Sequence, residues 1–291
     1  MGYNGRMPLK YDLHTHSTAS DGTLTPSQLV CRAVEAGIEV LSLTDHDTTE
    51  GLAELAGAAR RRGLGFVSGV EISVSWGPQV IHLVGLGFDP ASEPLQQGLQ
   101  RLRKFRQWRA EEIGRRLDKA GIPGAYQGAR ALSNGRLISR THFARFLVKE
   151  GYVPEVRKVF KGHLVRGKPG YVPGQWARLD EAIAWVREAG GQVVIAHPAR
   201  YPLTRTKLRQ LLGEFVEAGG VGLEVISGSH SRDDNYKMAG YAKDFSLLAS
   251  AGSDYHGPEN PWIDLGRLPD FPDTAVPIWH DWSIDEVGLT A

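Results

Sequence analysis

Histidine and carboxylate side chains recur where short β-rich runs of this sequence end. His14 and His16 close the first run, and Asp45, His46 and Asp47 close the second. Alternate residues of a strand point to the same side, so His14 and His16 present two imidazoles to one point. Imidazole nitrogens and carboxylate oxygens together suit Mn²⁺, Fe²⁺ or Zn²⁺ better than Ca²⁺. The spacing therefore predicts a metal centre.

Residues of the same types follow the later runs. The complete candidate ligand set is His14, His16, Asp21, His46, Glu71, His82, His197, Asp254 and His256. Taken alone, His46 or His82 is better explained as an ordinary structural histidine. Taken together, clustered carboxylates and imidazoles would cost stability without a cation. We therefore predict two or three divalent cations, with Mn²⁺ as first choice and Fe²⁺ or Zn²⁺ as alternatives.

The elements that must position these ligands alternate between strand and helix patterns. Strand-like runs cover 9–13, 40–43, 66–70, 80–84, 193–196, 221–226 and 245–250, and helical patterns cover 179–189, 204–218 and about 233–243. About seven strands alternating with helices favour a parallel α/β barrel. The carboxyl ends of such strands meet at one mouth, where active sites are built.

The strand rhythm stops between Ser92 and Tyr171, where apolar residues recur at nearly helical spacing. We predict that 1–91 and 172–291 form the barrel and that 92–171 is an inserted helical subdomain serving as a substrate lid. Its first helix carries seven Arg and Lys residues between 101 and 116. They could face an anionic substrate, but a solvated helix face is the interpretation we favour.

Composition excludes several classes of protein. The chain of 291 residues has a formal net charge of +1, which gives no general attraction to duplex nucleic acid or anionic membranes. Cys31 is the single cysteine, so an internal disulfide and a cysteine-built zinc site are excluded. No apolar run approaches the ~20 residues needed to span a bilayer. We expect a cytoplasmic protein without membrane partners.

These residues resemble a known family. His14-x-His16, Ser20-Asp21-Gly22, Thr44-Asp45-His46-Asp47, Glu71, His82, His197-Pro198 and Ser253-Asp254-x-His256 are similar to the motifs of the polymerase and histidinol phosphatase (PHP) family. The resemblance implies a distorted (β/α)7 barrel of the amidohydrolase-like group. It also implies three neighbouring cation sites: the first with His14, His16, Glu71 and Asp254; the second with Glu71, His82 and His197; the third with Asp21, His46 and His256.

The implied activity is hydrolysis of a phosphate ester. Divalent cations lower the pKa of bound water and offset the charge of the phosphoryl oxygens during in-line attack. Arg200 could bind the reacting phosphate or be a surface arginine. The leaving alkoxide could be protonated by His230 or by water.

The segment around His142 is similar to the insertion of the PHP branch that removes the 3'-phosphate of nucleoside 3',5'-bisphosphates. That likeness implies that Arg140, His142 and Lys168 hold the distal phosphate or nucleotide, and that Ser227 and His230 complete the pocket. By itself, His142 is better explained as a structural residue. The expected substrate is a small nucleotide or a short RNA.

Several other functions stay open. A 5'-3' exoribonuclease needs the same metals and would gain from exposed aromatic rings such as Trp108 or Tyr171 beside the mouth. Histidinol phosphate has one phosphate and gives no role to a second basic cluster, and C–N bond hydrolysis is a further alternative because fold does not determine function. A non-catalytic metal module would be expected to lack ligands, and none of the family's ligand positions is missing here.

Overall fold

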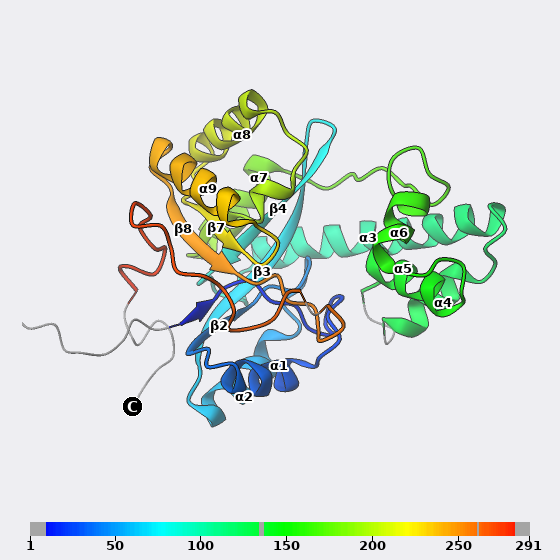
Figure 1. Cartoon of the computed structure of the whole chain (residues 1–291), viewed down its shortest axis with the longest axis horizontal. Helices are drawn as coiled ribbons and strands as arrows, with labels where there is room; N and C mark the ends of the chain where they lie inside the picture. The colour runs from blue at the N-terminus through cyan, green and yellow to red at the C-terminus, as the bar shows by residue number, and fades with distance from the viewer. Residues whose placement is uncertain (1–9, 134–136, 261, 283–291) are drawn as a thin grey trace, which may run out of the picture.

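The computed structural model describes residues 10–133, 137–260 and 262–282. Its centre is one mixed sheet whose main path runs in the order β1-β2-β3-β4-β6-β7-β8, while β5 pairs with β3. Leu13 N–H donates to Ala251 O at 2.9 Å, so the first and last strands of the path meet and the sheet nearly closes into a barrel (Figure 1). The strands are β1 (Tyr11–Asp12), β2 (Val40–Leu43), β3 (Gly65–Trp76), β4 (Gln79–Leu86), β5 (Ala177–Arg178), β6 (Gln192–Ile195), β7 (Gly222–Ser227) and β8 (Leu248–Gly252).

The direction of β4 departs from the predicted parallel arrangement. β4 pairs antiparallel with both β3 and β6, whereas the other strand pairs are parallel. Only Gly77 and Pro78 separate β3 from β4, and Gly77 has a φ of 54°. A parallel partner requires a crossover of a dozen or more residues, so this short turn dictates a hairpin. The α/β barrel is confirmed, and the expectation that every strand is parallel was wrong for β4.

Five helices cover the barrel as the alternating pattern predicted. They are α1 (Pro26–Glu35), α2 (Leu52–Arg62), α7 (Leu179–Glu188), α8 (Arg205–Glu217) and α9 (Arg232–Asp244). Each packs its buried apolar residues, such as Leu29 of α1 and Leu211 of α8, into one core with the strands. α1 begins at a capping box in which Thr25 accepts from Gln28 N–H and the Gln28 side chain accepts from Thr25 N–H.

The helices between β4 and β5 extend from the barrel to one side of it, and "the lid" is our name for this group of elements (Figure 1). It consists of α3 (Glu93–Lys119), α4 (Ala125–Leu132), α5 (Arg140–Lys149), α6 (Val156–Val159) and the π-helix η1 (Phe160–Leu164). Leu95, Leu99 and Leu102 of α3 belong to the barrel core, whereas Ile113 and Leu117 of the same helix belong to the lid core. One continuous helix therefore enters both cores. Among the described residues, no helix is both long and apolar enough to cross a membrane.

Candidate metal centre and adjoining cavity

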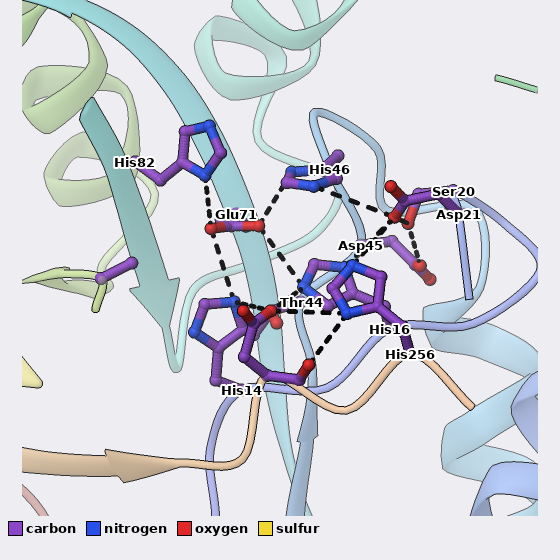
Figure 2. A network of polar contacts seen from close by, with 12 residues as sticks. His14, His16, Ser20, Asp21, Thr44, Asp45, His46, Glu71, His82 and His256 are labelled. Atoms are coloured by element: carbon purple, nitrogen blue, oxygen red, sulfur yellow. Dashed lines mark hydrogen bonds and ion pairs between the residues drawn. The ribbon is translucent and has the colours of Figure 1, made fainter. Parts of the chain in front are cut away.

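The predicted ligands converge at one end of the barrel, around the carboxylate of Glu71 (Figure 2). His46 Nδ1 lies 2.8 Å from Glu71 Oε2, and His82 Nδ1 lies 2.7 Å from Glu71 Oε1. His197 Nε2 approaches Oε1 at 3.1 Å. The strand-like run over 66–70 predicts that Glu71 lies at the end of a strand, but β3 continues to Trp76. The long β3–β4 hairpin thus delivers Glu71 and His82 from strand interiors.

Two further carboxylates extend the cluster. Asp254 Oδ1 lies 3.2 Å from His16 Nε2 and 3.6 Å from His14 Nε2. On the other side, Asp21 Oδ1 lies 3.3 Å from His256 Nε2 and 3.8 Å from His46 Nε2. All nine predicted ligands are therefore brought into one contiguous group.

The unsatisfied atoms of this group fit divalent cations. His14 Nε2, both ring nitrogens of His16 and Glu71 Oε2 are buried and have no hydrogen-bond partner among the described residues. Buried polar atoms are normally hydrogen-bonded. Potential metal-ligand atoms that are buried without a partner and face one another therefore indicate an ion. Ligand atoms within 4.8 Å of one another form three groups: His14, His16 and Glu71; His46, Glu71 and His82; and His16, Asp21, His46 and His256.

In the metal-free centre the electrostatics favour an ionised Glu71 and neutral His16 and His82, whereas the pKa values of His14, His46 and His256 are raised by neighbouring carboxylates despite their burial. Burial alone would raise the pKa of Glu71, but the imidazoles of His46, His82 and His14 hold it well below its usual range. Burial, with the nearby His256, lowers the pKa of His16 to about 3. Neutral imidazole and ionised carboxylate are the forms that bind metals.

Glu224 supports the centre and was missed by the sequence analysis. It lies in β7, and its Oε1 is 2.5 Å from His14 Nδ1 while its Oε2 accepts from His197 N–H at 2.5 Å. A carboxylate that holds the second ring nitrogen orients a ligating histidine and sets its tautomer. The available signal was a glutamate in the middle of an otherwise apolar strand run, 221–226.

Three residues of the centre have an unusual backbone conformation. Asp47, His197 and Asp254 have φ values of 52°, 32° and 58°, in the left-handed region that non-glycine residues rarely adopt. Such conformations persist where the surrounding structure imposes them, and they cluster at functional sites. Here they lie at the turns leaving β2, β6 and β8.

A cavity of about 300 Å³ adjoins the cluster, and the lid forms its opposite wall. Four arginines line it: Arg106 and Arg109 of α3, Arg140 of α5 and Arg200. The interpretation of the basic run on α3 as a solvated face was wrong for Arg106 and Arg109, which are both buried. Helical periodicity identified the helix but not which of its faces meets the barrel mouth.

The charges in this cavity are only partly balanced. Arg106 Nε donates to Asp47 Oδ2 at 2.5 Å, and another nitrogen of its guanidinium donates to Ser73 Oγ at 2.7 Å. Arg109 and Arg140 form no ion pair with a described carboxylate within 4.0 Å. Burial, together with the neighbouring Arg140 and Arg106, lowers the pKa of Arg109 to about 9. Buried cations without counterions form a site that an anion would stabilise.

Arg200 lies between the metal cluster and the arginines of α3 and α5. It follows His197 in a short 3₁₀ turn (Pro198–Arg200), and a terminal nitrogen of its guanidinium lies 2.5 Å from Asp254 Oδ2. Its side chain is 49% exposed. It therefore has room to turn toward a ligand at the metal cluster.

Four other predicted site residues have different surroundings. His142 Nδ1 accepts from Ser139 N–H at 3.0 Å, a helix-capping contact at the start of α5, and Lys168 is exposed. The two nitrogens of His230 contact backbone groups, Val225 O at 3.3 Å and Ala199 N–H at 3.4 Å. His142, Lys168, Ser227 and His230 are not among the residues that line the cavity. In this structure the ring of His142 contacts the start of α5, and the roles predicted for His142 and His230 stay predictions.

This chain is similar to known proteins over most of its length. A model of the PHP domain matches residues 12–153. The chain is 51% identical over 93% of its length to a 3',5'-nucleoside bisphosphate phosphatase of Chromobacterium violaceum, of which it covers 95%. It is 43% identical over 94% of its length to the 5'-3' exoribonuclease Rnm of Escherichia coli, of which it covers 93%.

Solved structures agree with these matches. An amidohydrolase from Chromobacterium violaceum, determined with bound sulfate and no metal, superposes with a TM-score of 0.90 at 50% identity, over 94% of this chain and 95% of that one. A protein from Bifidobacterium adolescentis, proposed to be a metal-dependent phosphoesterase, superposes with a TM-score of 0.82 at 29% identity, over 92% and 94% of the two chains.

Proposed function

Because this chain belongs to the PHP domain family and is a metal-dependent phosphoesterase, we propose that it removes the 3'-phosphate of nucleoside 3',5'-bisphosphates, such as adenosine 3',5'-bisphosphate. A bisphosphate has two anionic groups, and the site has two separate features that suit them. Mn²⁺ is the cation we propose for the centre. We also propose that this protein acts in the cytoplasm.

The observation that supports this substrate is the arginine-lined cavity beside the metal cluster. Arg109 is buried and Arg140 is half-buried, both without a described carboxylate partner, and Arg106 is held in place by Asp47 and Ser73. Guanidinium groups bind phosphate through paired hydrogen bonds. A phosphate that binds these arginines would leave the second phosphate of the same molecule to the cluster around Glu71. A monophosphate such as histidinol phosphate would leave the arginines without an anion.

Cations at the cluster would be held by the nine His, Asp and Glu side chains, and they would lower the pKa of water and offset the charge of the phosphoryl oxygens. The chain's own residues supply binding and orientation. Arg200 would contact the reacting phosphate, and Glu224 would hold His14 and the backbone of His197 in place. Phosphoryl transfer depends mainly on such positioning and electrostatic stabilisation.

A 5'-3' exoribonuclease activity on short RNA is the second candidate, and an aromatic series favours it. Trp176 lines the cavity, Phe105 packs against Trp176 at 4.8 Å between ring centroids, and Trp108 follows at 5.5 Å. Trp108 is 52% exposed. Exposed rings beside a phosphate site provide stacking surfaces for bases of a longer strand.

The deciding experiment measures phosphate release by the Mn²⁺-loaded protein. Adenosine 3',5'-bisphosphate is compared with 5'-AMP, 3'-AMP, histidinol phosphate and a short 5'-phosphorylated RNA, with His197→Ala as the inactive control. We expect preferred release of the 3'-phosphate, abolished in the variant. Activity confined to RNA would replace the substrate but keep the metal chemistry. Silence on every ester would reopen C–N bond hydrolysis.

A further inference from the structure

The two oxygens of the Asp21 carboxylate face different parts of the molecule, the metal cluster and the lid. Its Oδ1 faces the cluster, 3.3 Å from His256 Nε2 and 3.8 Å from His46 Nε2. Its Oδ2 faces the lid, where Ser139 Oγ and Thr141 Oγ1 each donate at 3.0 Å. Asp21 itself is almost fully buried.

The directions of these hydrogen bonds follow from the start of α5. Ser139 is the N-cap of α5, and its Oγ accepts from Thr141 N–H at 3.0 Å. Its hydroxyl proton is therefore free to donate to Asp21. Arg145, one turn further along α5, donates to the backbone oxygen of Asp21 at 3.1 Å. Three side chains of one lid helix thus hold this single residue of the barrel.

Both hydrogen bonds to Asp21 Oδ2 come from the lid within the described part of the chain. To the other oxygen, Oδ1, the barrel contributes Ser20 Oγ at 3.5 Å beside the imidazoles of His256 and His46. Partners that hold the second atom of a ligating group typically change metal affinity by about 10–100-fold when they are removed. The lid therefore controls the orientation of one ligand in the cluster.

We propose that Ser139 and Thr141 are positioning residues for Asp21, and that the lid through them sets the affinity of the cation held by Asp21, His46 and His256. This inference rests on the proposed metal centre. Arg140 lies between Ser139 and Thr141 in the sequence and lines the arginine-lined cavity, which we call the phosphate cavity after its proposed ligand. An anion that holds Arg140 in place therefore also holds Asp21. Because coupling between two binding sites is reciprocal, anion and cation should strengthen each other's binding.

The test measures cation binding directly. Metal-free protein is dialysed to equilibrium against increasing Mn²⁺, and bound manganese per chain is determined by atomic emission. Thr141→Val removes one donor with little change of shape, and Ser139→Ala removes the other. We expect one cation per chain to lose about tenfold in affinity in each variant, with the other cations unchanged. Thr141→Ser, which keeps the hydroxyl, should restore the wild-type curve.

A matched control separates this effect from the loss of a helix cap. Ser231 is the N-cap of α9 and forms the same kind of capping box as Ser139, but it has no contact with Asp21 in the described structure. Ser231→Ala should leave the manganese curve unchanged. Circular dichroism then checks that each variant keeps its helices.

A second arm tests the coupling to the anion. 5'-AMP is added during dialysis as a probe for the phosphate cavity. It should tighten the cation that the two variants weaken by several-fold in the wild type, and it should have a smaller effect in Thr141→Val. An unchanged curve in both variants, or an equal weakening of every cation, would overturn the inference while leaving the proposed function intact. A wild-type chain that binds no Mn²⁺ would overturn both.

Discussion

At the scale of single residues, Glu71 organises the centre. Five imidazoles lie within 3.5 Å of its two oxygens, those of His14, His16, His46, His82 and His197. Glu71→Gln removes the charge but keeps the shape. We expect phosphate release to fall by a factor on the order of 10³, because several kcal/mol of transition-state stabilisation depends on the cations. Manganese content should fall in the same samples. Full activity with fewer bound cations would contradict a central role for Glu71.

A second prediction concerns protons that compete with cations. Burial alone would lower the pKa of His256, but the carboxylates of Asp21 and Asp254 raise it to about 9 in the metal-free protein. Below this pH, His256 carries a proton that a cation must displace. Apparent Mn²⁺ affinity should therefore rise by up to about tenfold per pH unit toward pH 9 and then level off. Calorimetry at pH 7.5 in two buffers of different ionisation enthalpy measures the released proton, and equal heats in both would speak against this assignment.

The cavity arginines give a third prediction. Arg109→Ala and Arg140→Ala should each raise KM for adenosine 3',5'-bisphosphate by about 10–100-fold, since a hydrogen bond to a charged group contributes about 1.5–3 kcal/mol. Turnover of a generic aryl phosphate, which has no second phosphate, should change little. Lys168→Ala is the matched control, because Lys168 is exposed and does not line the cavity. An equal loss on both substrates would remove these arginines from distal-phosphate binding.

Residue types predicted which side chains gather in the candidate metal cluster better than they predicted which arginines line the adjoining cavity. The spacing of His14 and His16 indicates a shared ligand, because alternate residues of a strand point to the same side. Arg109 carries no such mark, because a buried arginine and a solvated one look alike in a run of basic residues. His142 likewise matched a motif, yet its ring caps α5. The hydrogen bond between the Ser139 N–H and His142 cannot be predicted from the spacing of residues in the sequence.

At the scale of elements, close helix packing depends on particular glycines. A Cβ on Gly98 of α3 would lie 2.5 Å from the ring of Trp185 in α7. Gly98→Ala should therefore lower the free energy of unfolding by about 1–2 kcal/mol, because overpacking outweighs the gain in helix propensity. Gly240 of α9 has no atom within 4 Å of its Cβ position, so Gly240→Ala should raise stability by up to about 1 kcal/mol. Urea denaturation measures both. The reverse order would show that α3 does not rest on Trp185.

The helices were more predictable than the course of the sheet. The pattern over 204–218 corresponds closely to α8 (Arg205–Glu217), since capping and periodicity are local properties. The reversal of β4 depends on two residues, Gly77 and Pro78, and an apolar run looks the same in either direction. The direction of β4 therefore depends on the length of the connection before it. The alternation of strand and helix patterns carries no information about that length.

At the scale of the whole molecule, cations should stabilise the fold. Without them, the described structure buries Asp21, Glu71 and Asp254 against clustered imidazoles with orphaned nitrogens. A ligand at about 100 times its Kd adds about 2.7 kcal/mol to stability. Chelation with EDTA should therefore lower Tm by about 5 °C or more, and added Mn²⁺ should restore it. The His197→Ala variant should respond less. Identical melting curves for the wild type with and without EDTA would mean that the cluster is stable without cations.

The helix α3 has a consequence for how the lid can be exchanged among related proteins. Because its first half belongs to the barrel core and its second half to the lid core, no flexible joint separates the two bodies on this side. One residue inserted between Leu102 and Phe105 would rotate everything beyond it by about 100° and advance it by about 1.5 Å. The arginines beyond that point would leave the cavity, and Asp21 would lose its support from α5. A lid can therefore be exchanged between related proteins only if the orientation set by the length of α3 is kept. We expect changes of length in this family to be tolerated in the loops of the lid that lie away from the barrel, and not within α3.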